Sequence, residues 1–208
     1  MKAFIFDLDG VIVSTDKFHY MAWKKMADEE GIYFDESIND RLRGVSRMDS
    51  LEIVLERSSK SYSASEKLLL ADRKNEYYKQ YLESLTEADR LPDVTETLSA
   101  LRQKGYKLAI GSSSKNTPII LKKIGFEGYF DAVSDGNNIK KSKPDPEVFI
   151  KAAEYLGEKP KDCFVVEDAE AGIDAAVSGG FTAIGIGVAS KYEKTQISLN
   201  KFSDLLNL

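Results

Sequence analysis

Two acidic side chains, Asp7 and Asp9, interrupt an apolar run near the start of the chain, in the segment F-I-F-D-L-D-G-V-I-V. A carboxylate at the end of a strand can attack phosphorus as a nucleophile and form an aspartyl-phosphate intermediate. A second carboxylate two residues further on can act as general acid and base for the leaving and entering oxygens. The pair is therefore suited to phosphoryl transfer.

Other uses of an acid pair at this spacing fit the sequence less well. A calcium loop of the EF-hand type that began at Asp7 would need Gly and Glu where the chain has Ile12 and Phe18. A glycosidase pair is conceivable, but carboxylates two residues apart leave little room to flank a glycosidic bond. No G-x-x-x-x-G-K-[ST] motif is present, which argues against a P-loop nucleotidase.

Polar side chains also follow three later apolar runs. They are Ser112 after L-A-I-G, Lys143 in S-K-P-D-P, and Glu167 with Asp168 after F-V-V. In an open α/β sheet, ligands bind beyond the carboxyl ends of the strands, so we expect these groups near the first acid pair. Four carboxylates there would repel one another unless a lysine and a divalent cation neutralised them, and hard oxygen ligands favour Mg²⁺. Without that context, Lys143 would be a solvated loop residue, and the later acids a charge pair at a helix start.

The elements that would place these groups alternate along the chain. The short apolar run at 3–6 is typical of a buried parallel strand that enters a loop. Beyond Leu91 the pattern predicts strands at 107–110, 132–133, 163–166 and 182–186, and helices at 94–104, 118–124, 147–156 and 171–178. Such alternation predicts an α/β fold with a parallel sheet and helices on both faces.

The block between the first strand and Leu91 has helical spacing only. Trp23, Met26 and Ala27 fall on one face of a helix over 16–30, and further helices are predicted at 36–42, 47–57 and 65–85. The polar run 58–65 is expected to be a loop, with Ser63 or Ser65 as the next helix cap. We therefore expect a catalytic core made of residues 1–14 and 89–208, and an inserted helical domain over 15–88.

Composition excludes several classes of protein. The chain has 208 residues, 42% of them hydrophobic, and a net charge of −5, which disfavours a nucleic-acid or anionic-membrane surface. The single cysteine, Cys163, lies in an apolar run and is expected to be a buried, inert thiol. No segment has a signal-peptide or membrane-span pattern. We expect a cytoplasmic protein, and the chain is long enough to be a monomer.

At this point the motifs resemble a known family. D-L-D-G-V, S-S-S-K, S-K-P-D-P and V-E-D-A-E-A-G-I are similar, in this order, to the motifs of the haloacid dehalogenase (HAD) superfamily of aspartyl phosphotransferases, over nearly the whole chain. H-Y-M-A-W-K, G-V-S-R, R-K-N and S-S-S-K-N resemble its β-phosphoglucomutase branch. The resemblance implies a Rossmann-like parallel-sheet core with a helical-bundle cap inserted after the first strand.

The resemblance also implies roles for the core residues. Asp7 would carry the phosphoryl group and Asp9 would be the general acid and base. Mg²⁺ would be held by the Asp7 carboxylate, the Asp9 main-chain carbonyl, Glu167 and Asp168. Ser112 and Lys143 would grip the transferring phosphoryl oxygens. Ser114, Lys115 and Asn116 would help to bind the sugar and phosphate.

In the inserted domain, the resemblance implies that Arg47 binds a second, non-transferring phosphate. Thr15 and His19 would help to position Asp9, and Lys74 would reach the site from a cap helix. Gly44, Ser46 and Trp23 complete the candidate substrate-binding set. Four of these residues have a plainer interpretation. His19 could be an ordinary histidine, Arg47 a surface charge at a helix start, Lys74 part of a charged helix face, and Trp23 a core residue.

Together these inferences predict an isomerase of carbohydrate metabolism. It would interconvert β-glucose 1-phosphate and glucose 6-phosphate, a small-molecule sugar phosphate, through glucose 1,6-bisphosphate. One alternative is a sugar-phosphate or other small phosphomonoester phosphatase with the same machinery, and another is a non-catalytic sugar-phosphate sensor. The return segment reads L-P-D-V, where relatives commonly have Gly after Pro, and the chain after Gly187 is short and divergent. The sequence therefore does not determine the behaviour of the hinge or the last edge of the sheet.

Overall fold

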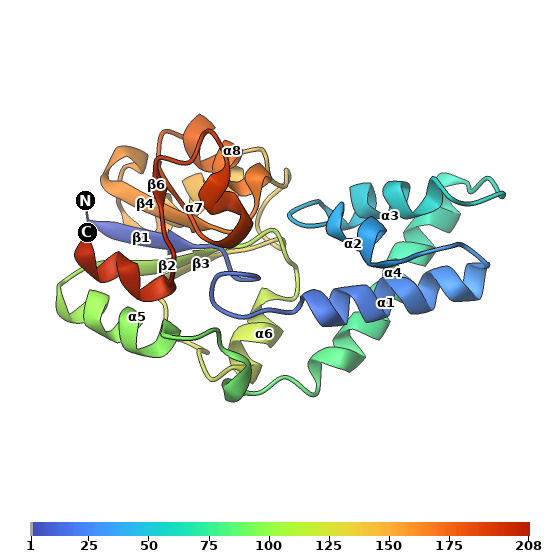
Figure 1. The fold of residues 1–208 in the computed structure, drawn as a ribbon, viewed down its shortest axis with the longest axis horizontal. Coiled ribbons are helices and arrows are strands. Elements are labelled where there is room, and N and C mark those ends of the chain that lie inside the picture. Colours follow the sequence, from blue (N-terminus) through green and yellow to red (C-terminus); the bar gives the residue numbers. More distant parts are fainter. Residues whose placement is uncertain (1) are drawn as a thin grey trace. The chain divides into compact units, whose positions relative to one another are not determined.

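The computed structural model describes residues 2–208 and divides into two compact units (Figure 1). The core unit comprises Met1–Ser14 and Thr86–Leu208, and the helical unit comprises Thr15–Leu85. The chain therefore leaves the core unit after its first strand and returns to it after the helical insertion. No helix within residues 2–208 is long and apolar enough to cross a membrane.

The core unit is built on a six-stranded parallel sheet with the order β3-β2-β1-β4-β5-β6. The strands are β1 (Ala3–Phe6), β2 (Lys107–Gly111), β3 (Ala132–Ser134), β4 (Cys163–Glu167), β5 (Thr182–Gly185) and β6 (Ile197–Ser198). All four side chains of β1 are fully buried, because this strand lies in the middle of the sheet with a layer on each face. The predicted α/β fold is confirmed.

Helices cover both faces of this sheet (Figure 1). On one face α7 (Glu147–Leu156) and α8 (Glu170–Ser178) pack against Ile5, Val165 and other buried side chains. The opposite face contacts α5 (Val94–Gln103), and the C-terminal turn η4 (Phe202–Asn207) also packs there. Alternate residues of β1 therefore belong to two different cores. The other helical elements of this unit are α6 (Thr117–Lys123), η1 (Glu87–Asp89), η2 (Pro160–Asp162) and η3 (Gly187–Lys191).

The C-terminal segment completes the sheet, although its sequence predicts no strand. β6 has only two residues, which pair with Ile184 and Gly185 of β5. Phe202 then packs against Phe6, with ring centroids 5.6 Å apart. A two-residue strand is too short for an apolar alternation to appear in the sequence, so only its tertiary pairing identifies it.

The helical unit consists of α1 (Asp16–Glu30), α2 (Glu36–Asp40), α3 (Arg47–Leu55) and α4 (Ala64–Leu82). Its core gathers apolar side chains from all four helices, including Trp23, Leu51 and Leu70. Ser63 caps α4 in a capping box with Glu66, as its place after the polar run indicates. The helix ends at Leu82, three residues earlier than the sequence pattern predicts.

One residue of the return segment is strained. Asp93 has φ +62°, the only positive φ of a non-glycine residue within 2–208, and its side chain accepts a hydrogen bond from Ser203 Oγ at 2.9 Å. Asp93→Gly and Asp93→Ala both remove that bond, but only glycine adopts this conformation without strain. We expect the glycine variant to be more stable than the alanine variant by about 1 kcal/mol in urea unfolding. Equal stability of the two variants would show that the backbone at position 93 is not strained.

Candidate functional site

The carboxyl ends of three neighbouring strands bring the predicted core residues together. β1 pairs in parallel with β2 and with β4, so the residues that follow these strands lie at one edge of the sheet. Asp7 follows β1, Ser112 follows β2, and Glu167 ends β4. The backbone amide of Asp7 still donates to Val166 at 2.9 Å, which fixes the start of the acidic loop on the sheet.

Three carboxylates and one lysine form the centre of this edge. Oxygen atoms of Asp7, Glu167 and Asp168 lie within 4.8 Å of one another. Lys143 Nζ donates to Asp7 Oδ1 and to Glu167 Oε1, at 2.5 Å each. It also lies 4.7 Å from the ring centroid of Phe149 on α7. The lysine is therefore a buried structural partner of the acids, and the interpretation as a solvated loop residue is wrong.

The acids at this edge strongly perturb one another. Burial raises the pKa of Glu167 to about 7, with Lys143 opposing the shift and Asp7 adding to it. Burial and the neighbouring carboxylates raise the pKa of Asp168 to about 8. Burial disfavours the charge of Lys143, but Asp7 and Glu167 together hold its pKa above the ordinary value. One lysine therefore does not neutralise the cluster, and a further cation would stabilise the ionised acids.

Two glycines leave the space that these carboxylates occupy. A Cβ atom on Gly172 of α8 would lie 1.9 Å from the carboxyl carbon of Glu167, and one on Gly10 would lie 2.1 Å from Asp168 Oδ2. The carboxylates are thus packed into a preformed cradle. Three converging hard-oxygen ligands in such a cradle fit a Mg²⁺ ion.

The segment after β2 forms a tight turn beside this edge. Ser112 is 4% exposed, and its hydroxyl accepts a hydrogen bond from the amide of Ser114 at 3.2 Å. The hydroxyl of Ser114 accepts in turn from the amide of Asn116. The main-chain carbonyl of Lys115 accepts from Asn137 Nδ2. These bonds fix the turn that carries the four predicted phosphate and sugar contacts.

In the helical unit, the predicted residues of α1 and α4 form a second polar cluster. Lys74 Nζ lies 2.8 Å from Nδ1 of His19 and 4.8 Å from the Trp23 ring centroid. Tyr78 packs its ring against His19 and shares a hydrogen bond with Thr15. Lys74 is only 2% exposed and Trp23 likewise 2%. The interpretation of Lys74 as part of a solvated helix face is therefore wrong, and Trp23 belongs to the core.

The G-V-S-R segment builds the start of α3. Gly44 has φ +71°, which permits the turn before the helix. Ser46 is the N-cap, and its hydroxyl accepts from the amide of Asp49. These two residues have structural roles that explain their identity. Arg47, which follows them as the first residue of α3, has no ion pair among the contacts of residues 2–208.

His19 is the only histidine of the chain, and it is expected to stay neutral at pH 6. Desolvation, followed by the positive charges of Lys74 and Arg47, lowers the pKa of His19 well below its ordinary value. The unfolded chain takes up this proton near pH 6.5, whereas the folded chain does so only at lower pH. The contribution to stability is therefore complete above about pH 6.5 and is lost as the pH falls.

Proton NMR of the single imidazole measures this pKa directly. Urea unfolding at pH 7 and pH 5 should show a smaller loss of stability for His19→Asn than for the unchanged chain. Titration of the imidazole near pH 6.5 would contradict the described surroundings of His19.

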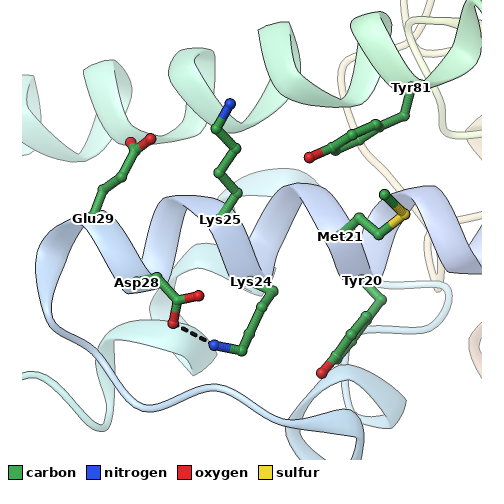
Figure 2. A pocket seen from close by; sticks show the side chains of 7 residues that line it. All are labelled: Tyr20, Met21, Lys24, Lys25, Asp28, Glu29 and Tyr81. Atoms are coloured by element: carbon green, nitrogen blue, oxygen red, sulfur yellow. Dashed lines mark hydrogen bonds and ion pairs between the residues drawn. The ribbon is translucent and has the colours of Figure 1, made fainter.

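A pocket of about 370 Å³ lies elsewhere on the helical unit, between α1 and α4 (Figure 2). Its charged groups already have partners: Lys24 pairs with Asp28, Glu29 binds Arg73, and Lys25 lies over the Tyr77 ring. None of the predicted site residues lines it. Its lining consists of Tyr20, Met21, Lys24, Lys25, Asp28, Glu29 and Tyr81.

Sequence reasoning missed four residues that shape these two clusters. Gly10 and Gly172 stand inside recognisable motifs, D-L-D-G and A-E-A-G-I, but an isolated glycine gives no hint of which side chain it admits. Phe149 and Tyr78 follow helical spacing and look like ordinary core residues. Only their neighbours in space, Lys143 and His19, indicate a further role.

Comparison with known proteins agrees with this architecture. A family model described as haloacid dehalogenase-like hydrolase matches residues 1–180. The β-phosphoglucomutase of Bacillus subtilis is 41% identical, over 99% of this chain and 92% of that protein. A phosphorylated carbohydrates phosphatase of Thermotoga maritima is 31% identical, over 88% of this chain and 84% of that protein.

Among solved structures, a β-phosphoglucomutase from Clostridium difficile superimposes with a TM-score of 0.92 at 38% identity, over 99% of this chain and 93% of that chain. Its similarity spans both the sheet and the helical insertion. With a parallel sheet that gathers an acidic cluster, a helical insertion after β1 and a family model that matches most of its length, the chain belongs to the haloacid dehalogenase-like hydrolases.

Proposed function

We propose that the chain is a Mg²⁺-dependent β-phosphoglucomutase, which interconverts β-glucose 1-phosphate and glucose 6-phosphate. One observation carries the choice of a mutase: the helical unit holds a buried ammonium group, Lys74 Nζ at 2.8 Å from His19 Nδ1, and the half-buried guanidinium of Arg47. The helical unit thus gathers two cations in addition to the lysine of the core unit. A bisphosphate intermediate needs two places that recognise phosphate, and guanidinium and ammonium groups suit the second one.

In the proposed reaction, phosphorylated Asp7 donates its phosphoryl group to the 6-hydroxyl of the sugar while Asp9 takes the hydroxyl proton. The resulting bisphosphate reorients. The free Asp7 carboxylate then attacks the other phosphorus, and Asp9 returns its proton to the departing sugar oxygen. Protons and phosphoryl groups therefore balance over one cycle, and the enzyme regains its phosphorylated nucleophile.

The other core residues support this transfer. Lys143, which already binds Asp7 and Glu167, offsets negative charge at the transferring group, and Ser112 donates a hydrogen bond to a phosphoryl oxygen. Mg²⁺ would be held by the Asp7, Glu167 and Asp168 carboxylates and the Asp9 carbonyl, and when bound it supplies electrostatic stabilisation of the phosphoryl oxygens. Ser114, Lys115 and Asn116 bind the sugar and its phosphate beside them.

The test is an assay with β-glucose 1-phosphate, Mg²⁺ and a trace of glucose 1,6-bisphosphate, in which glucose 6-phosphate and free phosphate are measured in the same tube. The mutase predicts glucose 6-phosphate without matching phosphate release. Phosphate release alone would identify a phosphatase, the activity named for the Thermotoga maritima relative.

Arg47→Gln tests the second phosphate site, with Arg57→Gln as its matched control. Arg57 is exposed on the same unit just after α3, so its loss removes the same charge without touching the cluster. We expect Arg47→Gln to lower kcat/KM by about a hundredfold, as befits a lost charge-assisted pair of hydrogen bonds, and Arg57→Gln to change it less than twofold. Equal activity of the two variants would rule out Arg47 as a phosphate ligand.

A further inference from the structure

Tyr78 occupies an unusual place in the helical unit. It lies in α4 and is 1% exposed, which makes it one of the largest fully buried side chains of the chain. Its neighbours include three polar groups. The hydroxyl is 2.8 Å from Thr15 Oγ1, the ring centroid is 4.1 Å from that of His19, and Lys74 Nζ is 4.8 Å from the ring centroid.

The Thr15 hydroxyl bonds Tyr78 at a position where an N-cap side chain usually bonds the backbone of its own helix. Thr15 is the N-cap of α1, yet its side chain makes no capping hydrogen bond to that helix. The caps of α3 and α4, Ser46 and Ser63, both make that bond. The Thr15 hydroxyl instead joins α1 to α4 through Tyr78, at the residue where the chain enters the helical unit.

The chemistry of tyrosine fits all three contacts at once. A buried phenol hydroxyl needs a hydrogen-bond partner, and Thr15 provides it. The ring face stabilises the Lys74 ammonium, which the Trp23 ring also approaches. The same ring lies against the imidazole of His19 and restricts its orientation toward Lys74. A leucine could fill this volume but would make none of these polar contacts.

We propose that Tyr78 is a positioning residue of the reaction, one side chain that fixes Thr15, His19 and Lys74 relative to one another. This inference rests on the proposed function for its kinetic consequence, because those three residues belong to the proposed substrate and acid/base machinery. Its structural content, the coupling of Tyr78 to Thr15 and to His19, does not depend on which sugar phosphate is turned over.

The kinetic test is a cycle of Tyr78→Phe, Thr15→Val and the double variant. Each single variant removes the same hydrogen bond from one side, so we expect each to lower kcat about three- to tenfold with little change in KM. The double variant should be no slower than the slower single variant, since the bond is lost only once. Tyr77→Phe is the matched control. It deletes a phenol hydroxyl on the same helix that binds Glu29, and should leave kcat unchanged.

Independent losses that multiply in the double variant, or an unchanged kcat in Tyr78→Phe, would overturn the role of the hydroxyl. Substrate-free NMR of the single imidazole tests the ring. In Tyr78→Phe the His19 resonance should keep its position and its titration, because the ring remains. In Tyr78→Leu the ring-current shift should disappear, because leucine fills the volume without an aromatic ring.

An unchanged His19 resonance in folded Tyr78→Leu protein would overturn the role of the ring. Because the NMR sample contains no substrate, this measurement tests the coupling of Tyr78 to His19 separately from the proposed function. If the unchanged chain produced no glucose 6-phosphate, the proposed function would fail while the coupling of Tyr78 to His19 would still be decided.

Discussion

Asp7→Asn is expected to abolish turnover, by about 10⁴-fold or more in kcat, while the protein stays folded. The amide has the shape of the carboxylate but is not a nucleophile toward phosphorus, and the loss of a covalent catalyst is among the largest single-residue effects in enzymes. Asp7 is only 8% exposed, so an isosteric change disturbs the packing little. Lys143 retains Glu167 as its ionic partner.

The same substitution changes two opposing interactions of the metal-free protein. Asp7 raises the pKa of both Glu167 and Asp168, so its removal relieves repulsion among the acids, but it also removes the buried ion pair between Asp7 and Lys143. We therefore expect only a small change in stability, and the protein should stay folded. The measurements are kcat by the coupled assay, thermal unfolding without metal, and the protein mass after incubation with glucose 1,6-bisphosphate. The phosphoryl adduct should be present on the unchanged chain and absent from the variant.

Asp40→Asn is the control, since it neutralises an exposed carboxylate of the helical unit and should change neither kcat nor the adduct. The mass spectrum also shows whether any asparagine has deamidated. Activity in Asp7→Asn protein of intact mass would rule out Asp7 as the nucleophile.

Gly172→Ala is expected to lower the affinity for Mg²⁺ by about 10- to 100-fold, with a matching loss of activity at limiting metal. Helix propensity alone predicts a more stable protein, since alanine stabilises a helix interior by about 1 kcal/mol over glycine. The added Cβ, however, would lie 1.9 Å from the carboxyl carbon of Glu167, far inside van der Waals contact. Steric exclusion therefore outweighs helix propensity at this position.

Displacement of Glu167 would break several hydrogen bonds. Its carboxylate accepts from Lys143 Nζ and from the backbone amides of Asp168 and Ala169, the last two at 3.0 Å. If the Glu167 side chain rotates away from the added Cβ, it loses these bonds and no longer lies beside the carboxylates of Asp7 and Asp168. Isothermal titration with Mg²⁺, together with the rise in melting temperature that Mg²⁺ produces, measures the effect.

Ser178→Ala is the matched control for this substitution. It also places an alanine in α8, at an exposed position whose hydroxyl bonds only its own helix. We expect it to keep the Mg²⁺ affinity of the unchanged chain. Identical affinities of the two variants would mean that Glu167 is not held by this cradle.

Much of the fold could be predicted from the sequence for a simple reason. An apolar run too short for a helix, followed by polar residues, identifies each long strand and its carboxyl end, and topology then requires those ends to meet at one edge. This reasoning predicts from the sequence that Asp7, Ser112 and Glu167 lie together. It missed β6, since two residues carry no periodicity.

What only the tertiary structure decided is which atoms touch. Lys143 and Asp7 are 136 positions apart in the sequence, and nothing local to either residue specifies a hydrogen bond between them. The cradle of Gly172 and the contacts of Tyr78 are likewise relations between elements, and they become visible only when α8 is packed beside β4 and α4 against α1. Residue types and their spacing determined the available chemistry. Close packing, which acts between segments distant along the chain, decided its arrangement.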